Sequence, residues 1–192
     1  MDHQRGWGTP RNSLLALLAL TLMAAGLLLS ANCRAATARE IDVSVDETLK
    51  QFAKQVAGGN EFLKSAKGVL IFPNVIKAGV GIGGEYGEGA LRIGGKTVGY
   101  YNIASASVGF QLGAQARSVI IAFMQEKALN DFRKSSGWKA GVDGSVALVN
   151  VGAEKSLDTL DVRNPIVGFV FGTKGLMYNL TLEGSKISKL DK

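Results

Sequence analysis

The sequence predicts an α+β fold that is mainly β, built on a strongly curved antiparallel sheet or a partly closed barrel. Glycine accounts for 25 of the 192 residues, about twice its average share of proteins. The period of the apolar residues also changes from roughly 3.6 to 2 near Lys67. Amphipathic N-terminal helices and one short mid-chain helix complete the predicted fold. Because 46% of the residues are hydrophobic, we expect residues 39–192 to form one domain with a buried core.

The N-terminal segment, residues 1–38, has the layout of a secretory signal peptide. Basic residues precede an uncharged stretch from Leu14 to Leu29, and small or polar residues follow it. Cleavage after Ala38 would release the domain into the periplasm, whereas cleavage before Cys33 would make this cysteine the lipid anchor of a lipoprotein. An uncleaved anchor is the third interpretation. We therefore expect a periplasmic protein, tethered to a membrane if Cys33 carries lipid.

The first predicted helix runs from Ser44 to Val56. Ser44 and Glu47 have the spacing of a capping box, and Gly58-Gly59 ends the helical pattern. The apolar stripe consists of Val45, Leu49, Phe52, Ala53 and Val56, with Lys50 and Lys54 on the other side. This stripe either packs on the core of the domain or lies in a membrane interface. A shorter second helix is expected to follow, capped by Asn60.

From Lys67 onward, alternation of apolar residues with glycine predicts a series of strands. The first of them is expected to end at Pro73-Asn74. The next segment, Ala78–Gly87, carries glycine along one face. Either the sheet coils tightly there, or something lies against that face: a closely packed helix, or a ligand or acyl chain in a groove. Gly94-Gly95 predicts a hairpin turn. Val119–Met124 is apolar on both faces, as is typical of a central buried strand.

The last third of the chain is predicted to contain one helix and three strands. The helix covers Glu126–Lys134, with Leu129 and Phe132 directed inward. The strands are expected at residues 138–153, 166–173 and 175–183, with a polar loop at 155–164 and a tight turn at Lys174-Gly175.

Two motifs suggest chemistry that their surroundings do not support. Residues 79–84 (GVGIGG) match the glycine pattern of dinucleotide-binding loops, but no helical pattern follows to hold a pyrophosphate. Glu85 and Glu88 could form a carboxylate pair, but we interpret them as solvated turn residues. Nucleotide binding and carboxylate catalysis are therefore not expected.

The rest of the composition excludes further classes of site. The chain has one histidine, His3, and one cysteine, Cys33, and both precede the predicted domain. Metal sites and histidine-assisted nucleophiles are therefore not expected. The net charge of +6 is spread along the chain and forms no basic run, which argues against a nucleic-acid partner. We expect a protein with no catalytic activity and no cofactor.

Five separated segments, in this order, resemble the SYLF domain family. They are Ala66–Pro73, Lys77–Gly79, Gly109–Ala114, Ala128–Phe132 and Gly141–Ala147. The similarity spans roughly residues 60 to 185. Together with the signal-like segment at residues 1–38, it suggests a bacterial exported member of the family. It implies a lipid-binding domain without enzymatic activity. In eukaryotic relatives the domain is associated with phosphoinositide binding through an amphipathic N-terminal helix, and with actin and the endocytic machinery.

Carried onto this chain, the resemblance places the lipid contacts on the helix at residues 44–56. Phe52 and Val56 are the candidate insertion residues, and Lys50 and Lys54 are the candidate headgroup contacts. The leading hypothesis is a module of the cell envelope that binds an anionic membrane surface through this helix. The alternative is a structural or protein-interaction component of the envelope, in which the helix belongs to the core and the sheet edge meets a protein partner.

Overall fold

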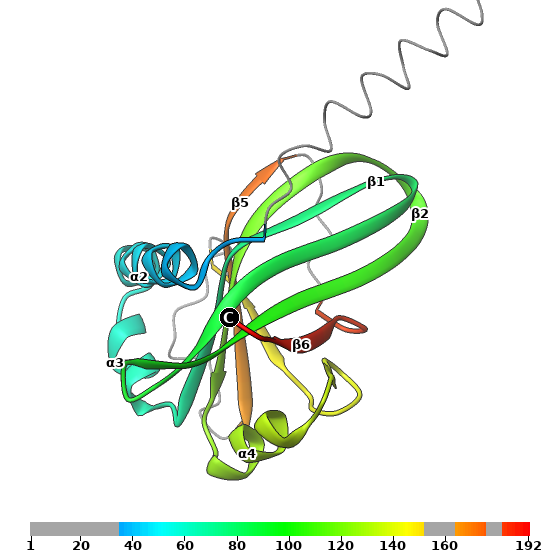
Figure 1. Ribbon diagram of the computed structural model, residues 1–192. Helices are drawn as coiled ribbons and strands as arrows, with labels where there is room; N and C mark the ends of the chain where they lie inside the picture. The colour runs from blue at the N-terminus through cyan, green and yellow to red at the C-terminus, as the bar shows by residue number, and fades with distance from the viewer. Residues whose placement is uncertain (1–34, 152–163, 176–181) are drawn as a thin grey trace, which may run out of the picture. The chain divides into compact units, whose positions relative to one another are not determined.

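The computed structural model describes residues 35–151, 164–175 and 182–192 (Figure 1). Most of the predicted signal segment, including Cys33, therefore lies outside the described residues. Residues 36–192 form one compact unit. Its elements are α2 (Ala38–Gln55), α3 (Gly59–Ser65), β1 (Gly68–Ile93), β2 (Lys96–Phe123), α4 (Glu126–Lys134), β3 (Trp138–Lys139), β4 (Ala147–Asn150), β5 (Ile166–Gly175) and β6 (Lys186–Leu190).

The first two strands form one long hairpin ribbon. Their antiparallel register runs from Gly68 opposite Phe123 to Ile93 opposite Lys96. The predicted turn at Gly94-Gly95 is confirmed, and both residues have positive φ angles of 56° and 78°, which glycine adopts without strain. The predicted end of a strand at Pro73-Asn74 is wrong. The register shifts between Phe72 and Val75, and a bulge of this kind accommodates a proline within a strand.

The strands form a strongly curled mixed sheet with the shape of a half-barrel. The strand order is β3-β6-β2-β5-β4, and β1 pairs with β2. The predicted fold class, α+β and mainly β, is confirmed. One pair departs from the predicted antiparallel arrangement, because β4 and β5 run parallel.

Close self-approach of β1 explains the glycines that alternate along it. A Cβ atom at Gly89 would lie 2.0 Å from the carbonyl oxygen of Ile71, and one at Gly87 would lie 2.9 Å from that of Asn74. The end of β1 therefore crosses the beginning of the same strand, and only glycine leaves room for that backbone. Of the alternatives for the glycine-bearing face, tight coiling of the sheet is confirmed at Gly87, because the chain itself fills the space beside this residue.

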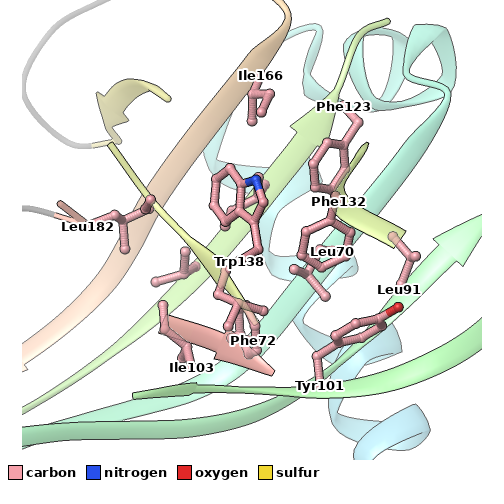
Figure 2. Close-up of a cluster of buried hydrophobic side chains, with 14 of the residues drawn as sticks. Leu70, Phe72, Leu91, Tyr101, Ile103, Phe123, Phe132, Trp138, Ile166 and Leu182 are labelled. Atoms are coloured by element: carbon pink, nitrogen blue, oxygen red, sulfur yellow. The ribbon is translucent and has the colours of Figure 1, made fainter. Parts of the chain in front are cut away.

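The inner face of the curled sheet is filled by the larger buried cluster. In Figure 2 the ring of Phe132, from α4, lies near those of Phe123 of β2 and Trp138 of β3. Its ring centroid is 4.9 Å from that of Phe123 and 5.8 Å from that of Trp138. The predicted helix at Glu126–Lys134 is confirmed, and Leu129 and Phe132 are buried as expected.

The outer face carries a second buried cluster, which α2 covers. Ile71, Ile120, Val167 and Phe169 supply its sheet side, and Ile41, Val45 and Phe52 supply its helix side. No helix within residues 35–151, 164–175 and 182–192 has the length and apolarity needed to cross a membrane.

The C-terminal strands differ from the prediction in their limits. The strand expected at 138–153 is two short strands, β3 and β4, separated by a turn that Gly141 starts with a φ of 84°. The predicted turn at Lys174-Gly175 is wrong, because both residues continue β5. Of the strand expected at 175–183, residues 176–181 lie outside the described part, and the last strand is Lys186–Leu190. The predicted loop at 155–164 also lies mostly outside it.

Candidate functional site

Helix α2 begins six residues before the predicted start. Thr37 is its N-cap and forms a reciprocal capping box with Glu40: the Glu40 carboxylate accepts from the Thr37 N–H at 2.7 Å, and the Thr37 hydroxyl accepts from the Glu40 N–H at 3.3 Å. The box predicted at Ser44 is wrong, since Ser44 lies inside the helix and its carbonyl accepts from the Thr48 hydroxyl. The pairs Thr37/Glu40 and Ser44/Glu47 both have the spacing of a capping box. The box at Thr37 was not predicted, because residues 1–38 were assigned to a signal segment.

The apolar stripe of α2 packs on the sheet. Phe52 is fully buried, and its ring centroid lies 4.9 Å from that of Phe169 and 5.5 Å from that of Phe171. Leu49 and Val56 are partly buried against the same cluster. Of the two interpretations of the stripe, packing on the domain's core is confirmed. With α2 in this position, Phe52 does not reach a membrane surface.

Polar contacts fix the N-terminal half of α2 to the β1–β2 hairpin. The carboxylate of Asp42 accepts hydrogen bonds from the hydroxyls of Thr97 at 2.7 Å and Tyr100 at 2.8 Å. Arg92 pairs with Asp46 at 2.8 Å. Burial, together with the bond to Asp42, raises the pKa of Tyr100 above its ordinary value. The helix is therefore held by both apolar and charged groups.

The two lysines predicted to contact lipid headgroups lie one turn apart on the solvent side of α2. Lys50 and Lys54 are both exposed, and the neighbouring Glu47 is exposed as well. The structure thus separates the four predicted lipid-binding residues into two lysines that face solvent and two apolar residues, Phe52 and Val56, that face the core.

Four polar residues occupy the inner face where the β1–β2 ribbon curls, and we call them the inner polar cluster: Lys77, Glu85, Gln115 and Arg117. Both carboxylate oxygens of Glu85 lie 2.8 Å from the Arg117 guanidinium, and the two residues are only 5% and 3% exposed. Lys77 and Gln115 are buried and stand opposite each other in the register. The interpretation of Glu85 as a solvated turn residue is wrong, because the curl of β1 carries it inside.

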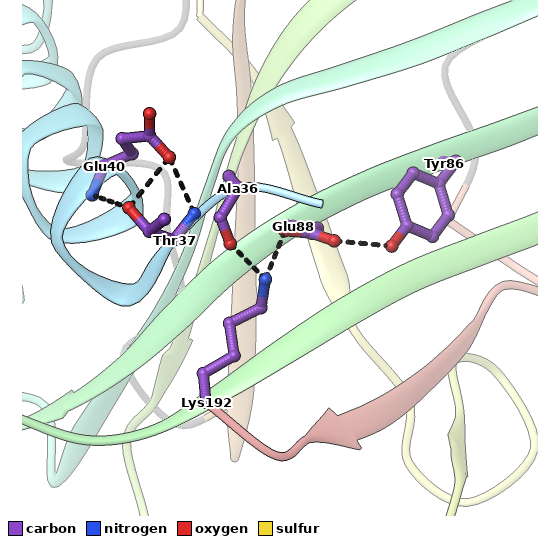
Figure 3. A network of polar contacts seen from close by, with 6 residues as sticks. All are labelled: Ala36, Thr37, Glu40, Tyr86, Glu88 and Lys192. Carbon is purple, nitrogen blue, oxygen red and sulfur yellow. Dashed lines mark hydrogen bonds and ion pairs between the residues drawn. The ribbon is translucent and has the colours of Figure 1, made fainter. Parts of the chain in front are cut away.

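Glu88 joins the two ends of the folded unit. Its carboxylate accepts from Lys192 at 2.9 Å and from the Tyr86 hydroxyl at 2.8 Å, and Lys192 also donates to the carbonyl of Ala36 (Figure 3). Burial acts to raise the pKa of Glu88, but the bonds from Lys192 and Tyr86 outweigh it and lower the pKa below its ordinary value. Glu88 is thus not the solvated residue that the sequence suggested.

A cavity of about 300 Å³ lies where α2 and α3 meet the start of β1 and the hairpin turn. Its lining is mostly apolar and includes Leu49, Leu63, Val69 and Ile71, together with the charged residues Lys64 and Arg92. Within the described residues, no three His, Cys, Asp or Glu side chains gather in a way that could hold a metal ion.

Comparison with protein families supports the resemblance seen in the sequence. A family model described as Ysc84, Las17-binding protein actin regulator, matches residues 104–192. The match confirms the SYLF resemblance. A comparison with curated proteins found no match. The matched region contains most of β2 and the elements after it, whereas α2 with Lys50 and Lys54 precedes it.

Proposed function

We propose that this SYLF domain is a lipid-binding module without enzymatic activity, which docks on an anionic membrane surface. The observation that carries the proposal is the family match over residues 104–192, because the SYLF resemblance implies lipid binding. The exposed positions of Lys50 and Lys54 support it, since a lysine that reaches an anionic surface gains about 1 kcal/mol.

In this proposal the residues of α2 have separate roles. Lys50 and Lys54 contact headgroups from the solvent side of the helix. Phe52 and Val56 keep the helix on the sheet, where Phe52 is fully buried. The charge contact is therefore made by a docked helix, without insertion of its apolar stripe.

The proposed location is the periplasmic side of a bacterial envelope. It rests on the signal-like segment at residues 1–38 and on Cys33 as the candidate site of lipid attachment. The intact mass of the protein purified from membranes tests the cleavage site and the lipid attachment together. A chain that starts at an acylated Cys33 supports the membrane-tethered form, and a chain that starts at Arg39 contradicts the tethered form.

Vesicle flotation of the full chain tests the lipid contact. We expect more protein to float with vesicles that contain phosphatidylglycerol than with neutral phosphatidylcholine vesicles, and this preference to fall at high salt. The double variant Lys50→Gln, Lys54→Gln should lower binding to the anionic vesicles roughly tenfold or more, from about 1 kcal/mol per lysine.

A matched control removes the same charge elsewhere. Lys127 and Lys134 are exposed on α4, and the variant Lys127→Gln, Lys134→Gln should bind anionic vesicles as the wild type does. Equal binding of the wild type to anionic and neutral vesicles would contradict the proposed function. Equal loss in both double variants would contradict the role of α2 alone.

The second candidate is a structural or protein-interaction component of the envelope. The observation that favours it is the packing of α2 as part of the core, which is what the alternative hypothesis required. The family is itself described by the binding of a protein, Las17. Capture of one defined envelope protein by the full chain, with no preference for anionic vesicles, would support this candidate over the lipid-binding module.

A further inference from the structure

Beyond the part that α2 covers, the described residues on the outer face of the β1–β2 ribbon include a group of exposed apolar side chains. We call its described side chains the outer ribbon patch: Ile76, Ala78, Ile82, Tyr86, Ala106 and Ala114. All six are exposed, Ile82 by 74%, Ile76 by 50% and Tyr86 by 48%. Figure 1 shows this part of the ribbon extending past the helices. Exposed apolar side chains gathered on one face of a folded domain are a candidate interaction surface.

The polarity of the ribbon is the reverse of that expected for a sheet with one face in water. Side chains alternate between the two faces of a strand, so Ile76 and Lys77 are on opposite faces. The charged Lys77, Glu85 and Arg117 are on the buried inner face, and the outer face carries the aliphatic residues. Such an arrangement suits a ribbon whose outer face meets an apolar phase.

Lysines border the patch on the same face. Residues directly opposite in an antiparallel pair project to the same side of the sheet. Tyr86 stands opposite Ala104, which stands opposite Lys186 on β6. Ile76 stands opposite Ala116, which stands opposite Lys174 on β5. Each row thus runs from a large exposed side chain, through alanine, to an exposed lysine.

We propose that the outer ribbon patch is the surface that enters the membrane interface, with Lys174 and Lys186 at the anionic headgroups. This inference rests on the proposed lipid-binding function and moves its apolar contact from α2 to the ribbon. The occupant is a bilayer surface, because the patch lies on a protruding ribbon and the lysines complement anionic lipid. Tyrosine at the border of the patch fits the same position, since its ring and hydroxyl suit the boundary between hydrocarbon and water.

The pairing of β1 with β2 places the patch on one ribbon, with a register shift between Val80 and Ile82. Helix α2 has no comparable free apolar face, because its stripe is used by the core.

The test places a fluorescent tryptophan in the patch of the full chain. Ile82→Trp is compared with Val142→Trp, which changes a side chain of the same 74% exposure in the turn before β4. Both variants keep Trp7 and Trp138, so the wild-type signal is subtracted. The probes are phosphatidylglycerol vesicles with and without bromine on the acyl chains, because bromine quenches tryptophan at contact. Thermal unfolding checks that both variants fold.

We expect brominated vesicles to quench tryptophan at residue 82 several-fold more strongly than tryptophan at residue 142. In the Ile82→Trp background, the double change Lys174→Gln with Lys186→Gln should weaken this quenching, because the chain binds the vesicles less tightly. The loss in vesicle affinity should be about fivefold for each lysine. The change Lys127→Gln with Lys134→Gln should leave it unchanged.

The outcomes separate the two proposals. If the chain floats with anionic vesicles and residue 82 is quenched no more than residue 142, the ribbon inference is wrong and the lipid-binding function stands. If the chain shows no preference for anionic vesicles, the proposed function fails as well. If tryptophan at residue 82 becomes shielded as the protein concentration rises without lipid, the patch is a contact between copies of this chain, and the inference is overturned.

Discussion

At the scale of single residues, the buried pair of Glu85 and Arg117 decides how the inner face of the ribbon is held. Both side chains are almost inaccessible to water, so removal of either one leaves a charge in a poorly solvated place. Arg117 makes further interactions, which adds to its constraint.

Replacement of one partner should therefore cost more than replacement of both. We expect Arg117→Met and Glu85→Leu each to lower the free energy of unfolding by about 3–5 kcal/mol. The double variant should lose less than either single variant, because no unpaired charge is left. Urea unfolding measures all three values, and additive losses in the double variant would show that the pair is not coupled.

At the scale of elements, the crossing of β1 over its own beginning is what turns a long hairpin into a curled sheet. Gly89 lies where a side chain would overlap the backbone oxygen of Ile71. A Cβ atom at Gly84, on the same strand, would have the carbonyl oxygen of Ser105 as its nearest neighbour, at 3.8 Å. Gly89 is therefore required by the close approach of two parts of β1, whereas no close approach requires glycine at position 84.

Alanine substitutions should distinguish these two glycines. Gly89→Ala forces the crossing strands apart and is expected to lower the free energy of unfolding by about 3 kcal/mol, at the upper end for overpacked cores. Gly84→Ala should stay within about 0.5 kcal/mol of the wild type, as is usual for changes without a new contact. Thermal unfolding of both variants provides the measurement. Equal effects would contradict the role of the crossing.

At the scale of the whole folded unit, Glu88 connects positions that are far apart in the chain. Lys192 contacts both Glu88 of β1 and the carbonyl of Ala36, next to the start of α2. The same N-terminal residues cap α2 through Thr37. The folded unit therefore uses Ala36 and Thr37, which cleavage after Ala38 would remove.

This connection makes stability depend on pH. The pKa of Glu88 is lowered in the folded state from an ordinary value of 4.5, so its contribution is present above that pH and is lost as the pH falls through the folded-state pKa. Glu88→Gln should unfold more easily than the wild type near neutral pH, and the difference should shrink on acidification. Urea unfolding across the acidic range measures this, and a constant difference would contradict it. Tyr86→Phe, which removes one donor, should give a smaller difference.

Local patterns were sufficient for several parts of the fold. The helix at Glu126–Lys134 was predicted with the correct limits, because its apolar residues and its neighbours agree on one period. The turn at Gly94-Gly95 and the burial of Val119–Phe123, within the strand predicted at Val119–Met124, also follow from short segments. The strand through Pro73 was missed, since only the pairing with β2 shows that a bulge absorbs the proline.

The candidate site was less predictable than the fold. The stripe on α2 was found from its spacing, but spacing is the same for a stripe that meets a sheet and one that meets a membrane. The inner polar cluster was missed because its members come from distant parts of the ribbon. One feature of the sequence could have indicated the cluster. Lys77 and Glu85 fall on the glycine-bearing face of β1, and a face that packs closely against another part of the molecule or an acyl chain is not expected to carry charge.

The sequence by itself determined the mainly β fold, the curl that its glycines permit, the SYLF resemblance and the amphipathic character of α2, since each depends on residues close together in the chain. Only the tertiary structure decided what those faces meet. It placed Phe52 in the core, closed Glu85 and Arg117 inside the ribbon and left Ile76 and Ile82 exposed. The physical reason is that burial depends on packing between distant segments, and no periodicity within one strand records which of its two faces the rest of the chain covers.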